Sequence, residues 1–315
     1  MPLADDVQTM LDALNAGFPR VEDMSAADAR AAVLARKQVV TDPEAVGSVT
    51  DTAIDGPGGR LPLRIYRPPV HDATAPLVAS PAIVFAHGGG FVFCDLDTHD
   101  ELCRSMANAV SAVVISVDYR LAPEHPAPAA AEDVHTALEW ARARSGELGI
   151  DPDRVVVAGD SAGGNLAAVT ALMDRDRTGP AIAGQVLIYP VIDNDFDTPS
   201  YRKFGEGYFN TRAAMQWYWQ QYAPDGARNA ARSHQIFPAR ADTLEGLPPA
   251  IVVTAACDPL ADEGRAYAER LRAAGVRTIH RRYEDVFHGF LTIPTLAITA
   301  QARTRLWADI AELLG

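Results

Sequence analysis

The sequence predicts an α/β protein with a mostly parallel central sheet and helices on both faces. From about residue 60, short apolar or β-branched runs alternate with longer segments of helical periodicity. The runs are nearly continuous in apolar residues, as in strands that are buried on both faces. Chemistry in such sheets lies at the carboxyl ends of the strands, so the residues after each run are candidate site residues.

The first 45 or so residues are expected to be helical. The spacing i, i+3, i+4, i+7 of one helix face is met by Val7, Met10, Leu11 and Leu14. Ser25 and Asp28 resemble a capping box that starts a second helix. The predicted strands then follow as LPLRIYRP, AIVFAH, AVVISVDY, RVVVAG, QVLIYP, AIVVTAAC and RTIHRRY. Helices are expected over roughly 128–145, 162–175, 262–274 and 297–314.

One segment, 193–225, interrupts the alternation. DNDFDTPSYRKFGEGYF is typical of a loop, and AAMQWYWQQYAP of an aromatic-rich helix. Long ordered excursions are usually functional, so we expect a lid over the sheet rather than an ordinary surface loop. The predicted organisation is one catalytic domain, with its core in 46–192 and 226–315, under a cap made of 1–45 and 193–225.

Composition narrows the possible partners and the compartment. The 315 residues carry a formal net charge of −13, which disfavours nucleic acid and anionic membranes as partners. No apolar run approaches the ~20 residues of a membrane span. The three cysteines, Cys94, Cys103 and Cys257, are too few for a disulfide framework. The N-terminal MPLADDVQTM does not resemble a secretory signal, so a cytoplasmic location is expected.

A candidate nucleophile lies between a predicted strand and a predicted helix. The segment Gly159-Asp160-Ser161-Ala162-Gly163 fits the pattern G-x-S-x-G. In that sharp turn the serine takes a strained backbone conformation, and the helix N-terminus favours negative charge at its oxygen. The alternative is a strand–helix connection with a capping serine. Asp160 is expected to anchor a neighbouring loop rather than to tune the serine.

A serine nucleophile needs a base and an acid that orients it. His288 follows the last predicted strand in EDVFHGF, whereas His280 falls inside that strand and His234 precedes the acid. Asp258 comes directly after AIVVTAAC and is the predicted acid. Asp262, a turn later, remains the fallback and is otherwise expected to begin a helix.

A glycine-rich loop is a candidate oxyanion site beside the predicted nucleophile, base and acid. FAHGGGFVF follows a predicted strand, and its backbone N–H groups can turn toward a tetrahedral intermediate. Gly89, Gly90 and Ala162 are the expected oxyanion donors, and His87 is expected to hold the loop. A phosphate cradle or a plain turn are the alternatives, although the G-x-G-x-x-G and GK[ST] patterns of nucleotide sites are missing.

Other candidates concern the pocket and metals. The substrate pocket is expected to be lined by Phe91, Phe209, Trp217, Tyr218 and Leu260, although aromatic residues at helical spacing could instead form the core of the cap. Asp193, Asp195 and Asp197 have the spacing of the first ligands of a calcium loop. However, Thr198 stands where such a loop needs glycine and Phe204 where it needs glutamate. No metal and no cofactor are therefore expected.

With these residues in place, the chain resembles the hormone-sensitive lipase family of α/β-hydrolases, in its bacterial carboxylesterase group. The matching segments are HGGGF, LDTHD, VDYRLAPEHPAPAA, GDSAGG, GLPPAIVVTAACDPLADEG and HGF. The resemblance implies the α/β-hydrolase fold with a helical cap, hydrolysis of a small-molecule ester without a cofactor, and a possible homodimer through an edge strand such as 277–283. It assigns catalysis to Ser161, Asp258 and His288 and the oxyanion hole to Gly89, Gly90 and Ala162.

Two features leave the substrate open. Phe93 and Cys94 stand where many relatives have smaller or glycine-rich sequence, so the wall near the oxyanion loop is expected to be unusual. A substantial cap favours short- to medium-chain esters. An amidase or lactonase could use the same triad. A non-catalytic receptor is disfavoured because the plant gibberellin receptors of this kind lack the catalytic histidine, which is present here.

Overall fold

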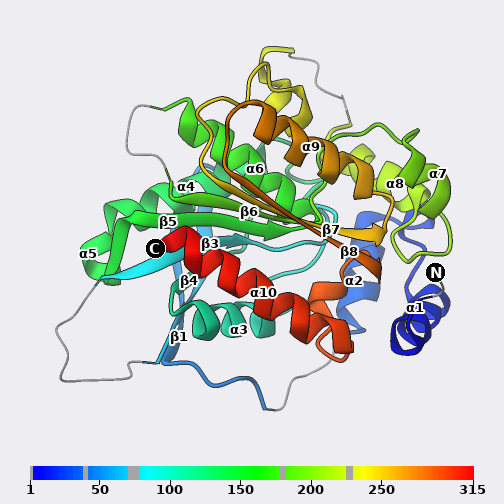
Figure 1. Cartoon of the computed structure of the whole chain (residues 1–315), viewed down its shortest axis with the longest axis horizontal. Helices are drawn as coiled ribbons and strands as arrows, with labels where there is room; N and C mark the ends of the chain where they lie inside the picture. The colour runs from blue at the N-terminus through cyan, green and yellow to red at the C-terminus, as the bar shows by residue number, and fades with distance from the viewer. Residues whose placement is uncertain (1–2, 38–41, 70–78, 178–181, 225–229) are drawn as a thin grey trace.

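The computed structural model describes residues 3–37, 42–69, 79–177, 182–224 and 230–315. In this part of the chain the strands form one eight-stranded sheet in the order β1-β2-β4-β3-β5-β6-β7-β8 (Figure 1). The strands from β3 to β8 are parallel to one another. Strand β2 pairs antiparallel with both β4 and β1. Their bounds are Ser48–Gly56, Gly59–Arg67, Ser80–Ala86, Val113–Val117, Ile150–Asp160, Gly184–Ile188, Ala250–Cys257 and Thr278–Phe287.

Helices cover both faces of the sheet. In Figure 1, α4, α6 and α9 lie above it, and α3 and α10 lie below it. The helices α1 to α10 span Asp5–Gly17, Ala26–Leu34, Asp100–Val110, Ala129–Ala143, Ser145–Leu148, Ala162–Arg175, Pro199–Phe204, Arg212–Tyr222, Ala261–Ala273 and Ala297–Leu314. The α/β-hydrolase fold expected from the sequence is therefore confirmed.

Two cores explain why the central strands are mostly apolar. Along β3, Ala82, Val84 and Ala86 pack with the helices above the sheet. The alternate residues Ile83 and Phe85 pack with α3 and α10 on the other face. Successive side chains of a strand point to opposite faces, so a sheet covered on both faces needs apolar residues at every position.

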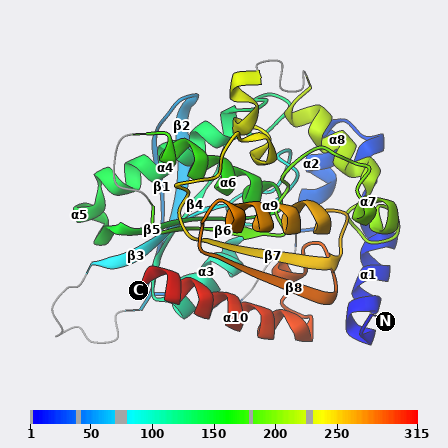
Figure 2. The same cartoon turned by 45° about the horizontal axis from the view of Figure 1, so that its top comes forward.

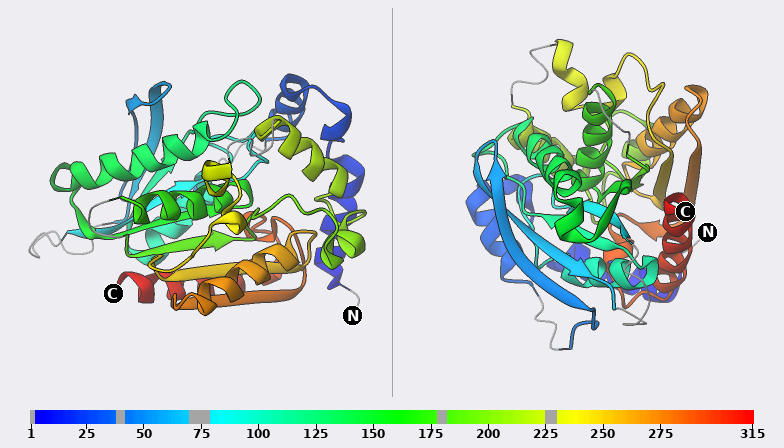
Figure 3. Two further views of the ribbon diagram at one scale, coloured as in Figure 1. Left: turned by 90° about the horizontal axis from the view of Figure 1, so that it is seen from above. Right: turned by 90° about the vertical axis from the view of Figure 1, so that its left-hand side faces the viewer.

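Four segments at one end of the sheet come from distant parts of the sequence. Figures 2 and 3 show α1, α2, α7 and α8 gathered at the end of the sheet opposite the C-terminus. The side chain of Asn15 on α1 donates to the Gly207 carbonyl and accepts from the Phe209 N–H, at 2.8 and 3.0 Å. The Phe18 ring meets the Phe209 ring edge-on at 5.0 Å. These contacts join the N-terminal helices to the 193–225 segment.

The structure corrects the expected element map in three places. Residues 199–204, expected as loop, form the short helix α7, because Thr198 accepts the Tyr201 N–H and Pro199 occupies the first turn. Strand β1 was not expected because most of its residues are exposed. The amphipathic helix α3 was also missed.

Other expectations about local structure have separate outcomes. The Ser25 cap of α2 is confirmed, because its hydroxyl oxygen accepts the Asp28 N–H at 3.2 Å. The predicted boundary between 225 and 226 lies outside the described residues. Among the helices in the described ranges, none is long and apolar enough to cross a membrane.

Candidate active site

The turn between β5 and α6 holds Ser161 in a backbone conformation that side chains rarely adopt. Its φ and ψ are 55° and −117°, and its N–H donates to the Ile188 carbonyl at 2.8 Å. A Cβ at Gly159 would lie 2.2 Å from the Gly163 carbonyl oxygen, and one at Gly163 would lie 1.9 Å from that of Ala86. The two glycines are therefore required for so sharp a turn.

Ser161, His288 and Asp258 form one chain of hydrogen bonds. The Ser161 Oγ lies 2.8 Å from His288 Nε2, and His288 Nδ1 lies 2.7 Å from Asp258 Oδ2. Asp258 is 1% exposed, and its other oxygen accepts the Leu260 N–H at 3.0 Å. A buried carboxylate held in this way keeps the proton on Nδ1, which leaves Nε2 free to accept the serine proton.

The rival residues are engaged elsewhere. Asp262 accepts the Ser200 N–H at 2.8 Å, in the contact between α7 and the start of α9. His280 on β8 lies 2.9 Å from the Thr254 hydroxyl. The base and the acid are thus the two residues that the sequence favoured.

The glycine-rich loop after β3 turns on two left-handed residues. Gly89 and Gly90 have φ of 111° and 60°, and a Cβ on Gly90 would lie 2.3 Å from the Tyr218 ring. The Gly89 carbonyl accepts the N–H groups of Val92 and Phe93 at 3.0 and 3.1 Å. Within the described residues the N–H groups of Gly89, Gly90 and Ala162 have no protein acceptor. Three unpaired donors near a nucleophile are what an oxyanion hole needs, and that assignment stays a prediction.

His87 supports this loop from behind. It is fully buried and stacks on Tyr119 with 4.3 Å between ring centroids. The Tyr119 hydroxyl donates to the His87 carbonyl at 2.8 Å. Burial, together with the neighbouring His99, lowers the pKa of His87 to about 4, so the ring is neutral at pH 7. The side chain has a scaffold position and does not contact Ser161.

A cavity of about 260 Å³ opens onto the nucleophile. Ser161, His288, Gly89 and Gly90 line it. Of the expected pocket residues, Phe91, Phe209 and Tyr218 line it. Its wall also includes Leu14, Phe18, Val21, Val33 and Met215, which sequence reasoning did not select. Only the apolar stripe of the first helix hinted at these N-terminal residues.

Two expected pocket residues do not line this cavity. On α8 the cavity is lined by Ala214, Met215 and Tyr218, and Tyr218 lies one turn after the other two. Trp217 is not among the lining residues, and it is 8% exposed. Leu260 belongs to the turn that holds Asp258, and its side chain is buried. These residues pack the surroundings of the site rather than its wall.

One group in the described ranges has the residue types of a metal site. His135, Glu139 and Asp174 bring their ligand atoms within 4.8 Å of one another. However, Arg142 binds Asp174 at 2.6 Å and Arg177 pairs with Glu139. The two guanidinium groups already neutralise both carboxylates, and we assign no metal to the group.

The comparisons with known proteins agree with this geometry. A family model described as alpha/beta hydrolase fold matches residues 83–292. The chain is 44% identical over 269 residues to the carboxylic ester hydrolase LipN of Mycobacterium tuberculosis, covering 84% of this chain and 70% of that protein. The solved structure of a hyperthermophilic esterase from the archaeon Pyrobaculum calidifontis superposes with a TM-score of 0.89 at 39% identity, over all of both chains.

A third similar protein was solved in complex with a small compound. It is the ester-hydrolase EH1AB1 from the metagenome of Lake Arreo, in complex with a bipyridine phosphonate derivative. It has a TM-score of 0.90 and 37% identity and covers 98% of each chain. With the triad, the fold and these likenesses together, the chain belongs to the hormone-sensitive lipase family of α/β-hydrolases and is a carboxylic ester hydrolase.

Proposed function

We propose that this protein is a serine carboxylesterase for short- to medium-chain esters, with Ser161 as nucleophile. The observation that carries the proposal is the hydrogen-bond chain from Ser161 through His288 to Asp258, of which Ser161 and His288 line a mostly apolar cavity. Nucleophile, base and orienting acid within hydrogen-bond reach are the signature of covalent acyl transfer.

The reaction follows from the positions of the protons. His288 Nε2 takes the Ser161 proton while Oγ attacks the ester carbonyl, and Asp258 stabilises the imidazolium that forms. The imidazolium then protonates the leaving alcohol, and an acyl-serine remains. In the second half His288 takes a proton from water, which attacks the acyl group and releases the acid and free Ser161.

The oxyanion is proposed to bind the N–H groups of Gly89, Gly90 and Ala162. Their lack of a protein acceptor in the described chain supports this, as does the cavity that Gly89 and Gly90 line together with Ser161. Ala162 is also the first residue of α6, so the positive end of the helix dipole adds to the attraction. Losing one such donor typically costs about 10²- to 10³-fold in kcat.

The substrate range is proposed from the cavity and from the segments that cover it. The cavity volume of about 260 Å³ is slightly below that of most ligand sites, which is typically ~300–1,000 Å³. We propose that 1–45 and 193–225 form the cap, because Phe18 and Val21 share the cavity wall with Phe209 and Tyr218. A cap packed this closely favours short acyl chains over emulsified triglyceride.

The test is hydrolysis of p-nitrophenyl esters from acetate to palmitate by wild type and Ser161→Ala. We expect fast turnover of short esters that disappears in the variant. Folded wild type that fails on every ester but cleaves p-nitroanilides or lactones would replace the ester by an amide or lactone. Turnover that survives in Ser161→Ala would remove Ser161 from the mechanism.

Three coarser properties are also proposals. The partner is a small-molecule ester, in keeping with the apolar cavity and the net charge of −13. A cytoplasmic location is supported by the free thiols of Cys94, Cys103 and Cys257. A homodimer through β8 is supported by the place of that strand at the edge of the sheet, and light scattering after gel filtration tests it.

A further inference from the structure

A second buried histidine–aspartate pair lies beside the triad. His99 Nε2 is 3.1 Å from Asp160 Oδ1, and the two residues are 6% and 4% exposed. Both line the catalytic cavity. Asp160 directly precedes Ser161 in the chain, yet neither side chain of this pair takes part in the proton transfers described above.

The Asp160 carboxylate connects the nucleophile turn to the glycine-rich loop. The oxygen that faces His99 also accepts the Gly88 N–H at 2.8 Å. A Cβ on Gly88 would lie 2.6 Å from the other oxygen, so the loop is pressed against the carboxylate. Burial alone would raise the pKa of Asp160, but His99 and the Gly88 N–H outweigh it and the pKa lies below its ordinary value. These two donors therefore favour the anionic form of Asp160.

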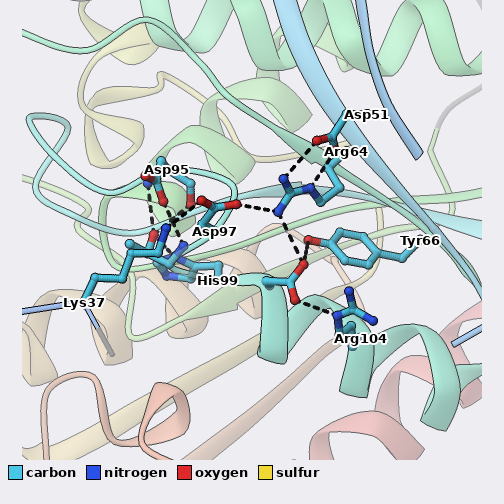
Figure 4. Close-up of polar contacts among 10 residues, drawn as sticks. Lys37, Asp51, Arg64, Tyr66, Asp95, Asp97, His99 and Arg104 are labelled. Atoms are coloured by element: carbon cyan, nitrogen blue, oxygen red, sulfur yellow. Dashed lines mark hydrogen bonds and ion pairs between the residues drawn. The ribbon is translucent and has the colours of Figure 1, made fainter. Parts of the chain in front are cut away.

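His99 is itself held from behind by a polar turn (Figure 4). The Thr98 hydroxyl lies 3.1 Å from His99 Nδ1, and it accepts the Asp95 N–H and donates to the Asp95 carbonyl. Asp97 in the same turn binds Arg64 of β2 and Lys37, just after α2, at 2.7 and 2.6 Å. The imidazole therefore has little freedom to rotate away from Asp160.

We propose that His99 is a positioning residue for ester hydrolysis, whose Nε2–H holds the Asp160 carboxylate on the Gly88 N–H and so places the N–H groups of Gly89 and Gly90. This inference rests on the proposed function and its oxyanion hole. His99 reaches neither Ser161 nor His288 and acts only through Asp160. Its effect therefore belongs to the step in which negative charge develops on the carbonyl oxygen.

The proposal predicts a particular kinetic signature. The oxyanion forms only in the transition state, so a misplaced loop lowers kcat while substrate binding is little changed. The test compares two substitutions of similar size and shape. His99→Met has no donor, whereas His99→Gln can place an N–H near the position of Nε2.

We expect His99→Met to lose about 10- to 100-fold in kcat, with KM within about threefold, less than the loss of a whole oxyanion donor. His99→Gln should recover most of that loss. A trifluoromethyl ketone, which forms a tetrahedral adduct with the serine, should bind His99→Met more weakly by the factor lost in kcat/KM. His280→Met is the matched control, because His280 also bonds a hydroxyl, Thr254, but lies on β8 away from the cavity.

Four outcomes would overturn the proposal. They are an unchanged kcat in His99→Met, an equal loss in His99→Gln, a loss that appears only in KM, or unchanged affinity for the ketone. If His99→Met does not fold, as judged by thermal unfolding, Asp160→Asn tests the same contact from the carboxylate side and should show the same kcat signature. Inactivity of the wild type on esters would instead defeat the proposed function, so the two failures are distinguishable.

Discussion

The active site contains two buried histidine–aspartate pairs that differ in which ring nitrogen faces the acid. In His288–Asp258, Nδ1 faces the carboxylate at 2.7 Å and Nε2 faces Ser161. In His99–Asp160, Nε2 faces the carboxylate at 3.1 Å and Nδ1 faces the Thr98 hydroxyl. In the first pair the histidine contacts the nucleophile, Ser161, and in the second pair the aspartate accepts the Gly88 N–H of the glycine-rich loop.

The comparison teaches that orientation, and not residue type or burial, separates proton transfer from positioning. Both histidines are less than 10% exposed. Only His288 has its second nitrogen free for a reacting group, because the β8–α10 loop presents it to Ser161. Three predictions test this division between the nucleophile side and the oxyanion-loop side, and a fourth tests the protonation of the buried Glu263.

The largest effect is expected on the nucleophile side. Asp258→Asn should lower kcat by about 10⁴-fold, because an amide stabilises the wrong tautomer of His288 and cannot stabilise the imidazolium. Steady-state kinetics with p-nitrophenyl butyrate measures it. Asp262→Asn is the control, since Asp262 binds Ser200 and not an imidazole. A larger loss in Asp262→Asn would exchange the two roles.

The next effect concerns the oxyanion loop itself. Gly90→Ala should lose about 10²-fold in kcat, because the new Cβ meets Tyr218 at 2.3 Å and displaces a proposed oxyanion donor. Gly149→Ala is the matched control. Gly149 has a similar φ of 67°, against 60° at Gly90, but no atom lies within 4 Å of its Cβ. Equal activity losses in the two variants would mean that backbone strain alone, and not the loop position, causes the defect.

A smaller change is expected where Cys94 forms the wall beside the loop. Cys94 has a φ of 72°, which glycine adopts without strain, and its side chain lines the cavity. Cys94→Gly should enlarge the cavity and raise the hexanoate-to-acetate ratio of kcat/KM by about 10-fold, the value of roughly one methylene in an apolar pocket. Cys257→Ala, outside the cavity, should leave the ratio unchanged. An unaltered ratio in Cys94→Gly would exclude that wall from acyl selection.

The smallest effect concerns stability behind the nucleophile. Glu263 accepts the Ile192 N–H at 2.7 Å, and burial, with Asp193 and Asp258 nearby, raises its pKa well above 4.5. A raised pKa contributes stability that is complete below the unfolded pKa and lost as the pH rises toward the folded one. Glu263→Gln keeps the acceptor without the charge, so its urea midpoint relative to wild type should increase from pH 5 to pH 8. A constant difference would contradict the assigned pKa direction.

The sequence could predict the sheet and the triad because both depend on local patterns. The central strands are apolar runs, and the G-x-S-x-G turn needs its glycines because a Cβ there would collide with backbone carbonyl oxygens. The order of serine, acid and histidine along the chain then leaves few candidates. Strand β1 was not predicted because its side chains are mostly exposed and show no apolar run; the strand is defined by its backbone pairing with β2, in which Gly56 lies opposite Gly59. The DGPGG turn could have indicated this hairpin.

The rest of the site depends on contacts between distant segments. The cavity wall combines Phe18 with Phe209, and the facing side of α8 is decided by its packing, which placed Trp217 outside the wall. The His99–Asp160 contact joins residues 61 positions apart in different motifs. No periodicity or spacing in the sequence marks such a pair, and only the fold brings it to the oxyanion loop.

The most direct test of the central claim is covalent labelling. Wild type and Ser161→Ala are incubated with an alkyl p-nitrophenyl phosphonate, and intact mass and released p-nitrophenol are measured. The account predicts one phosphonyl group on each wild-type chain, located at Ser161, with one p-nitrophenol released and no label on the variant. A label on Ser161→Ala, or an active wild type that takes up none, would contradict Ser161 as the nucleophile.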